Sequence, residues 1–108
     1  MKTGTILLIP FPFSELTDIK VRPAVVIALT KDKYADIILA AISSQVPTKT
    51  TGNEILIQPE KRNGLRIVSV IKVDRIFTLK KEKVIAVLGE LSVPETDQFI
   101  TIFKSLPD

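Results

Sequence analysis

Apolar residues form short blocks along the chain, and polar or proline-containing segments separate these blocks. The blocks at residues 5–10, 24–30 and 36–43 are almost continuously apolar, which is typical of strands buried on both faces. The block at residues 53–58 alternates between apolar and polar positions, and it predicts a strand with one buried face. The first half of the chain is therefore expected to form short β-strands joined by polar loops.

Two further strands and one helix complete the predicted elements. Residues 67–79 form a partly alternating run that is long for a single strand, so we expect it to bend. Residues 84–88 predict the last strand. A helix is expected after Ser92, because Ser92 and Glu95 have the spacing of a capping box, and Pro107 ends it. Its apolar residues form one stripe at helical spacing, which indicates a core or dimer contact rather than a cofactor site: Phe99, Ile102, Phe103 and Leu106.

The composition favours a mainly β fold. Ile, Val and Thr make up 35 of the 108 residues, and β-branched side chains favour strands. Five or six short strands and one terminal helix in a chain of this length indicate a single domain, built as a small antiparallel barrel that is closed or nearly closed. A barrel of this size has no deep internal cavity, so we expect a binding site in a surface groove between loops.

Charge is distributed unevenly along the chain. The net charge is only +3, but residues 61–83 contain eight Lys or Arg side chains and only two acidic ones. Residues 84–108 contain one Lys and four acidic side chains. The basic segment is compatible with an anionic partner, and equally with a solvated strand face.

The sequence contains no cysteine and no histidine. Zinc sites built on these residues, iron–sulfur ligation, thiol catalysis, disulfides and Ser-His-Asp chemistry are therefore excluded. Neither a glycine-rich phosphate loop nor the carboxylate spacing of Ca²⁺ or Mg²⁺ loops occurs, so we expect no cofactor and no metal site. The longest apolar run, residues 6–13, is shorter than the roughly 20 residues of a membrane-spanning helix, and we expect a cytoplasmic protein without a membrane partner.

The first candidate site residue is Arg22, which lies where a polar loop at residues 14–21 meets a buried strand. Pro23 fixes the backbone at that point, and the planar guanidinium group is suited to phosphate oxygens. A strand-edge ion pair between Arg22 and Asp18 or Glu15 is the alternative interpretation.

Two other polar groups are candidates. Ser43, Ser44 and Gln45 follow a buried strand, where they can bind phosphate, sugar or base edges, or can cap their own loop. The long strand is interrupted by a second group, in which a carboxylate beside cations can accept a proton, or can form an exposed cross-strand ion pair: Lys72, Asp74 and Arg75.

In several places the sequence resembles the PemK/MazF-like toxins. Residues 4–13 (GTILLIPFPF) and 22–27 (RPAVVI) are similar to the opening strands of this family, and residues 40–45 (AAISSQ) are similar to its next block. Residues 73–76 (VDRI) and 87–92 (VLGELS) resemble the closing blocks before a final helix. The similarity extends over nearly the whole chain in the order of the family.

The resemblance implies an SH3-like barrel with a C-terminal helix, the CcdB/MazF-like toxin fold, assembled as a homodimer. It also implies a bacterial type II toxin that inhibits growth by cleaving single-stranded RNA, often mRNA, at short sequences without a metal ion. The partner implied beside the RNA is a cognate antitoxin, whose extended C-terminal segment blocks the RNA groove at the dimer interface.

The resemblance assigns roles to individual residues. Arg22 matches the catalytic arginine, Ser43 stands where a hydroxyl residue assists at the phosphate, and Asp74 matches an acidic residue proposed as a general base. Lys72 stands where some members have an arginine as the acid partner, and lysine keeps the charge but loses the planar fork. The residues expected to bind RNA beside them are Phe13, Lys20, Ser44, Gln45 and Arg75.

We therefore hypothesise a metal-independent endoribonuclease in which RNA lies along residues 61–83 and Arg22. Phe11 and Phe13 are the aromatic residues expected to be exposed beside it. One alternative is a catalytically inactive RNA-binding relative. The other is a CcdB-like gyrase poison, which is disfavoured because the chain has no tryptophan and ends with residues 105–108 (SLPD).

Overall fold

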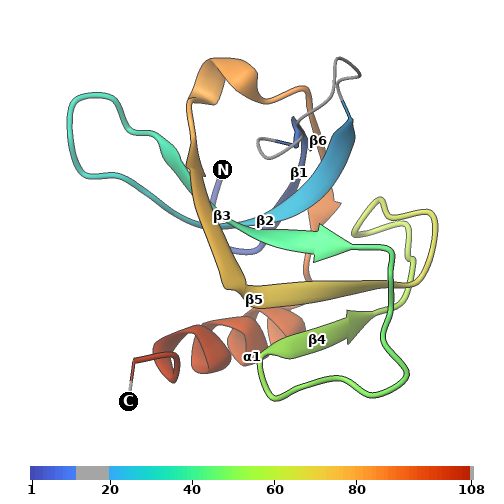
Figure 1. Ribbon diagram of the computed structural model, residues 1–108. Helices are drawn as coiled ribbons and strands as arrows, with labels where there is room; N and C mark the ends of the chain where they lie inside the picture. Colours follow the sequence, from blue (N-terminus) through green and yellow to red (C-terminus); the bar gives the residue numbers. More distant parts are fainter. Residues whose placement is uncertain (12–19, 108) are drawn as a thin grey trace.

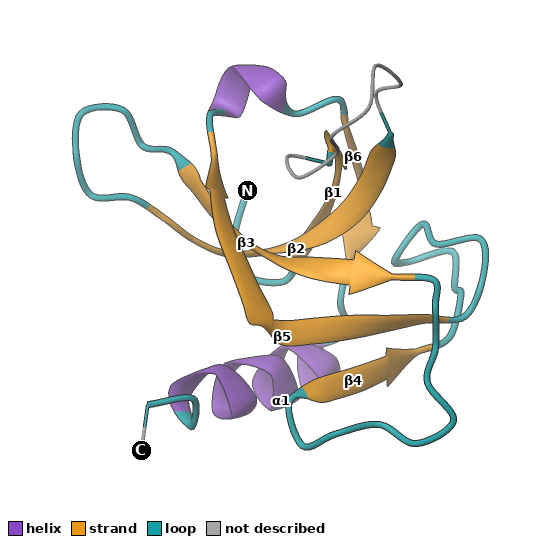
Figure 2. Ribbon diagram, in the orientation of Figure 1, coloured by secondary structure: helices purple, strands orange, loops and turns teal. Residues whose placement is uncertain are grey.

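The computed structural model describes residues 1–11 and 20–107 of the protein. This part of the chain forms one antiparallel sheet of six strands, a short 3₁₀ helix and one α-helix (Figure 2). In chain order the elements are β1 (Thr5–Pro10), β2 (Val21–Leu29), β3 (Ile37–Ser43), β4 (Glu54–Ile57), β5 (Ser69–Leu79), η1 (Lys81–Lys83), β6 (Ala86–Glu90) and α1 (Val93–Lys104). The predicted mainly β fold with a C-terminal helix is confirmed.

The sheet has the strand order β4-β5-β3-β2-β1-β6 and curls into a half-barrel (Figure 1). Its two edge strands, β4 and β6, are not paired with each other. The turn that follows β4 lies across the opening, because the backbone N–H of Glu90 in β6 donates to the carbonyl of Arg62 at 3.0 Å. The predicted barrel therefore does not close: the sheet is a half-barrel, and the turn bridges the opening between its edge strands.

The long strand β5 bends sharply in its middle (Figure 1). Ala40 of β3 pairs with Ile76 of β5, but the next residue, Ala41, pairs with Lys72. Residues 73–75 consequently have no partner on β3 and form a bulge, which bends the strand and redirects its side chains. The predicted bend is confirmed, and it lies within the charged segment.

Two clusters of buried side chains lie on opposite faces of the sheet. The first lies between the sheet and α1 and contains Ile6, Val25 and Phe99. The second contains Leu7 and Val26 and is covered by side chains from the outer arm of β5, which is the part of the strand after the bulge (residues 76–79). Neighbouring residues of β1 and β2 therefore enter different clusters, and Ile6 and Leu7 are both 0% exposed. This explains why the sequence of these strands is apolar without alternation.

Helix α1 begins as predicted. The Ser92 hydroxyl accepts a hydrogen bond from the Glu95 backbone N–H at 3.3 Å, and the Glu95 carboxylate accepts one from the Ser92 N–H at 2.8 Å. Phe99 is fully buried, and the rest of the apolar stripe packs against the first cluster, so the stripe is a core contact. No helix in the described part of the chain is long and apolar enough to cross a membrane.

The boundaries of three strands were predicted wrongly. β5 begins at Ser69 instead of residue 67, because the backbone at residues 66–67 forms a bend. β2 begins at Val21 instead of residue 24, because the residue before a proline favours extended backbone and the ladder with β1 continues to the Pro10–Val21 pair. β6 lies two residues further along the chain than predicted. The N–H of Val84 donates to the Lys81 carbonyl at 3.1 Å, so Val84 belongs to the end of η1.

The turn between β2 and β3 is organised around the exposed carboxylate of Asp32. Its Oδ1 atom accepts hydrogen bonds from the Thr30 hydroxyl at 2.9 Å and from the backbone N–H groups of Tyr34 and Ala35 at 3.0 and 3.2 Å. These donors, above all the Thr30 hydroxyl, stabilise the charged form and hold the pKa of Asp32 below its ordinary value of 3.8.

This turn predicts a pH dependence at the acidic end. Because the folded pKa is lowered, the contribution of Asp32 to stability is present above the unfolded pKa of about 3.9 and is lost as the pH falls through the folded pKa. An NMR titration of the Asp32 carboxyl carbon should give a pKa below 3.8, with the amide signals of Tyr34 and Ala35 shifting in the same transition. Thr30→Val, which removes the hydroxyl donor, should raise this pKa, and a wild-type pKa at or above 3.8 would contradict the hydrogen-bonded turn.

Candidate active site

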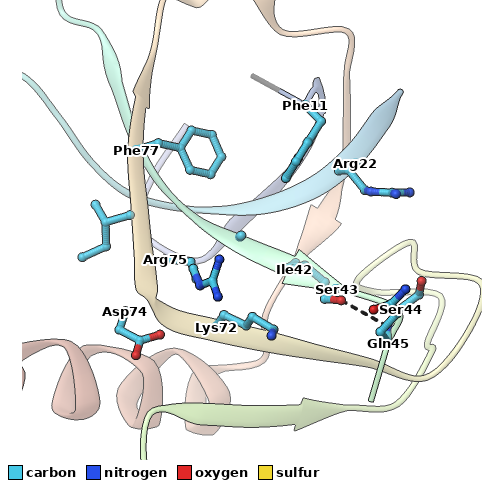
Figure 3. Close-up of a pocket in the computed structure, with 12 residues that line it drawn as sticks. Phe11, Arg22, Ile42, Ser43, Ser44, Gln45, Lys72, Asp74, Arg75 and Phe77 are labelled. Atoms are coloured by element: carbon cyan, nitrogen blue, oxygen red, sulfur yellow. Dashed lines mark hydrogen bonds between the residues drawn. The ribbon is translucent and has the colours of Figure 1, made fainter. Parts of the chain in front are cut away.

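A groove of about 550 Å³ lies where the start of β2, the end of β3 and the bend of β5 meet (Figure 3). Three strands that are distant in sequence therefore contribute to one surface. The groove is lined by Phe11, Arg22, Ala41, Ile42, Ser43, Ser44, Gln45, Lys72, Asp74, Arg75, Ile76 and Phe77.

Arg22 is an exposed residue of β2 whose position is set by pairing with β1. It lies opposite Ile9, and the ladder extends one residue further because the Phe11 N–H donates to the Lys20 carbonyl at 2.8 Å. Phe11 and Arg22 are therefore diagonal neighbours on one face of the two strands. The Arg22 Cζ atom lies 5.9 Å from the centroid of the Phe11 ring, within cation–π range.

The alternative interpretation of Arg22 was an ion pair with Asp18 or Glu15. Both of these residues lie outside the described part of the chain. Within residues 1–11 and 20–107, no carboxylate forms an ion pair with Arg22. In this part of the structure, its guanidinium contacts an aromatic ring and keeps its fork of donors for an anion.

The second wall of the groove is formed by residues 43–45. Ser43 is the last residue of β3, and its Oγ atom accepts a hydrogen bond from the backbone N–H of Gln45 at 3.1 Å. The predicted loop-capping role is therefore present. It is compatible with anion binding, because the Ser43 hydroxyl still has its own hydrogen to donate.

The third wall is the bulge of β5. Arg22 and Phe11 lie at one end of the groove and Asp74 at the other, with Lys72 and Arg75 between them (Figure 3). Three cationic side chains and one carboxylate thus line the same groove. Within the described residues, no ion pair links Asp74 to Lys72, although their spacing had predicted that they share a face; the bulge between them breaks the alternation of the strand.

Lys72 instead pairs with Glu54, its partner on β4. The Nζ atom lies 3.9 Å from the Glu54 Oε2 atom. The cross-strand ion pair that was the alternative for this segment is therefore present at Lys72, but it is half-buried rather than exposed. The sequence pattern does not mark Glu54, because only the register of β4 against β5 brings it beside Lys72.

The structure brings seven of the nine predicted site residues into the groove: Arg22, Ser43, Ser44, Gln45, Lys72, Asp74 and Arg75. Lys20 is exposed but does not line the groove. Phe13 lies outside the described residues. Phe11 and Phe77 add aromatic walls, and Phe77 was missed because it stands within an apolar strand pattern.

The basic segment at residues 61–83 does not lie along the groove as a whole. Of the eight basic residues in this segment, only Lys72 and Arg75 line the groove. The remaining basic residues lie before the start of β5 or after its end: Lys61, Arg62, Arg66, Lys80, Lys81 and Lys83. The expectation of RNA along the whole segment is therefore narrowed to the bend of β5.

No group of three or more acidic side chains that could hold a metal ion occurs among the residues that the structure describes. The charged side chains that gather in the groove are mainly cationic, and Arg and Lys side chains bind anions such as phosphate.

Fold and groove together define a class of small protein, in which a curled antiparallel sheet with a C-terminal helix encloses a cationic groove at its bent strand. The sequence model of the PemK-like, MazF-like toxins of type II toxin–antitoxin systems matches residues 2–104. The chain therefore belongs to this family, and the resemblance that its motifs carry is confirmed.

Two solved structures are similar to this fold. An endoribonuclease from a mycobacterial species, in complex with its cognate antitoxin, aligns with a TM-score of 0.72 and 15% sequence identity over 100% of this chain and 98% of that chain. The Mycobacterium tuberculosis toxin MazF-mt6 aligns with a TM-score of 0.66 and 16% identity over 92% of this chain and 91% of that chain. At these identities the likeness shows a shared fold. No curated protein matches the sequence significantly.

Proposed function

We propose that this protein is an endoribonuclease toxin of a type II toxin–antitoxin system, which cleaves single-stranded RNA at short sequences and thereby inhibits growth. Membership of the toxin family supports the general activity. The observation that carries the proposal is the groove itself, in which Arg22, Ser43, Lys72, Asp74 and Arg75 come together from three strands.

The proposed reaction uses the 2′-hydroxyl of the RNA as the nucleophile. Its oxygen attacks the adjacent phosphorus, the bond from phosphorus to the 5′-oxygen breaks, and the products carry a 2′,3′-cyclic phosphate and a 5′-hydroxyl. The protein has to accept one proton, stabilise the charge on the crowded phosphate and supply a proton to the leaving oxygen. Side chains can meet all three requirements, so we propose that the reaction needs no metal ion.

Each requirement has a candidate in the groove. Arg22 stabilises the phosphate through its planar fork of donors, and the Ser43 hydroxyl donates its hydrogen to a phosphate oxygen. Asp74 accepts the proton from the 2′-hydroxyl. Lys72 supplies the proton to the leaving oxygen and also attracts the RNA backbone. In this arrangement the scissile phosphate lies between Arg22 and Asp74, and bases stack against Phe11.

The proposal includes a protein partner. The mycobacterial neighbour was solved in complex with its cognate antitoxin, which supports an antitoxin for this chain as well. We propose that an antitoxin segment occupies the same groove and excludes RNA, and that the toxin acts in the cytoplasm as a homodimer. A binding segment with carboxylate side chains would complement the three cations of the groove.

The proposal is tested with purified protein and a long single-stranded RNA in buffer containing EDTA. We expect discrete cleavage products that end in a 2′,3′-cyclic phosphate. The matched control is the same RNA with a 2′-deoxy nucleotide at one mapped cleavage site, which should be resistant at that site only. Tight RNA binding without cleavage would instead identify a catalytically inactive RNA-binding relative. A protein that neither binds nor cleaves RNA would overturn the proposal.

Asp74→Asn tests the assignment of the proton acceptor. The amide keeps the shape of the side chain but cannot accept the proton, so kcat should fall by about 10²- to 10⁴-fold while KM changes little. Single-turnover cleavage of a short RNA measures this. Asp97→Asn, an exposed neutralisation on α1 away from the groove, is the control and should leave kcat unchanged. Cleavage by Asp74→Asn at the wild-type rate would move the proton acceptor to another residue.

A further inference from the structure

We propose that Glu54 is a positioning residue for Lys72, which it orients at the wall of the groove while competing with RNA phosphate for the ammonium group. This inference rests on the proposed function, because the positioning matters for RNA cleavage. Glu54 does not itself line the groove, but it forms an ion pair with Lys72, which does.

The two side chains are brought together by sheet register. Glu54 of β4 lies directly opposite Lys72 of β5, next to the bulge. The Lys72 Nζ atom lies 3.9 Å from Glu54 Oε2, and the two side chains are only 31% and 11% exposed. Water screens this pair less than it screens a fully exposed ion pair, so the carboxylate restricts where the ammonium group points.

The carboxylate is itself fixed from its other side. Glu54 Oε1 accepts a hydrogen bond from the backbone N–H of Thr51 at 2.8 Å. The neighbouring carbonyl of Asn53 accepts a hydrogen bond from the N–H of Val73, the first residue of the bulge, at 3.0 Å. The turn at residues 51–54 therefore contacts both the Lys72 side chain and the backbone of the bulge. It fixes the position of the Lys72 ammonium group relative to the bulge.

A lysine at this position needs such a partner more than an arginine would. The ammonium group ends a flexible stem and has no planar fork, so its own geometry does not fix its orientation toward a phosphate. Glu54, which lies outside the groove, supplies that orientation through its ion pair with Lys72. The same negative charge competes with RNA for Lys72, because the ammonium group has to divide its donors between the carboxylate and the phosphate.

Loss of the Glu54 charge is expected to strengthen RNA binding and to slow RNA cleavage. Glu54→Gln keeps an oxygen that can accept from Thr51 but removes the charge, so Lys72 is freed without disturbing the turn. RNA with a 2′-deoxy nucleotide at the cleavage site should then bind about two- to fivefold more tightly. The kcat for the cleavable RNA should fall roughly tenfold, because Lys72 is less well placed. Glu54→Asp, which keeps the charge on a shorter stem, should lower kcat without tightening binding.

The decisive test is a double-mutant cycle with Lys72→Ala. If Glu54 acts through Lys72, both effects of Glu54→Gln should disappear in the Lys72→Ala background. Glu90→Gln is the matched control, because Glu90 pairs with Lys2 at 3.5 Å outside the groove and its loss should change neither constant. Thermal unfolding of each variant verifies that it is folded.

Two kinetic or binding outcomes would overturn the inference: effects of Glu54→Gln that persist undiminished without Lys72, or no change in either constant. A third measurement keeps this result separate from the proposed function. The NMR order parameter of the Lys72 ammonium group should fall in Glu54→Gln without any RNA present. A wild-type protein that cleaves no RNA would overturn the proposed function, and an unchanged order parameter would overturn the positioning role.

Discussion

Arg22→Ala is expected to lower kcat for RNA cleavage by about 10²- to 10³-fold, the range seen when one donor that stabilises transition-state charge is removed. In the described part of the structure, the guanidinium has no carboxylate to neutralise it, and Phe11 and the ladder with β1 fix its place at the end of the groove. Its donors are therefore already oriented when the phosphate arrives. Single-turnover cleavage of a short RNA in EDTA measures the effect.

Two variants sharpen this test. Arg22→Lys keeps the charge but loses the fork, so it should bind RNA nearly as well as the wild type and still cleave far more slowly. Arg66→Ala removes an exposed cation that does not line the groove, and it should reduce affinity slightly without changing kcat. Equal cleavage by Arg22→Ala and wild type would remove Arg22 from the proposed mechanism.

Gly89→Ala is expected to lower the free energy of unfolding by about 2–3 kcal/mol. A Cβ atom on Gly89 would overlap the carbonyl oxygen of Arg62, which belongs to the turn that crosses the opening of the half-barrel. The obstacle is backbone and not a flexible side chain, so β6 or the turn would have to move, and the hydrogen bond from the Glu90 N–H to the Arg62 carbonyl would be strained.

Gly52→Ala is the matched control for this substitution. Gly52 lies in an exposed turn, and nothing lies within 4 Å of the position that a Cβ atom would occupy. Urea denaturation should show a clear loss of stability for Gly89→Ala and almost none for Gly52→Ala. Similar stabilities of Gly89→Ala and wild type would mean that the Arg62 turn is not tightly held against β6.

The core strands and the helix could be predicted because their signals are local. The unbroken apolar runs of β1 and β2 reflect burial on both faces, and the capping box of Ser92 and Glu95 marks the start of α1. The boundaries of β2 and β6 could not be predicted in the same way. They depend on how far each strand stays paired with its neighbour, as the Pro10–Val21 pair shows.

The site was predictable where each residue carries its own chemistry. Arg22, Ser43 and Asp74 stand out as polar side chains at the ends or bends of apolar strands, and all three line the groove. Glu54 could not be found this way, since it looks like the exposed polar position of an ordinary half-buried strand. Its place beside Lys72 follows from the register of two strands, and register is a property of the whole sheet.

The bulge of β5 also constrains how this protein can change. The first part of β5, up to the start of the bulge, places Ile71 and Val73 in the cluster beneath α1. The outer arm directs Phe77 and Leu79 to the cluster on the other face of the sheet. Deleting one residue from 73–75 would reverse the alternation of the outer arm and turn Ile76 and Thr78 toward the core in place of Phe77 and Leu79. The two cores of the sheet therefore fix the number of residues in the bulge, whatever chemistry the side chains of the bulge carry out.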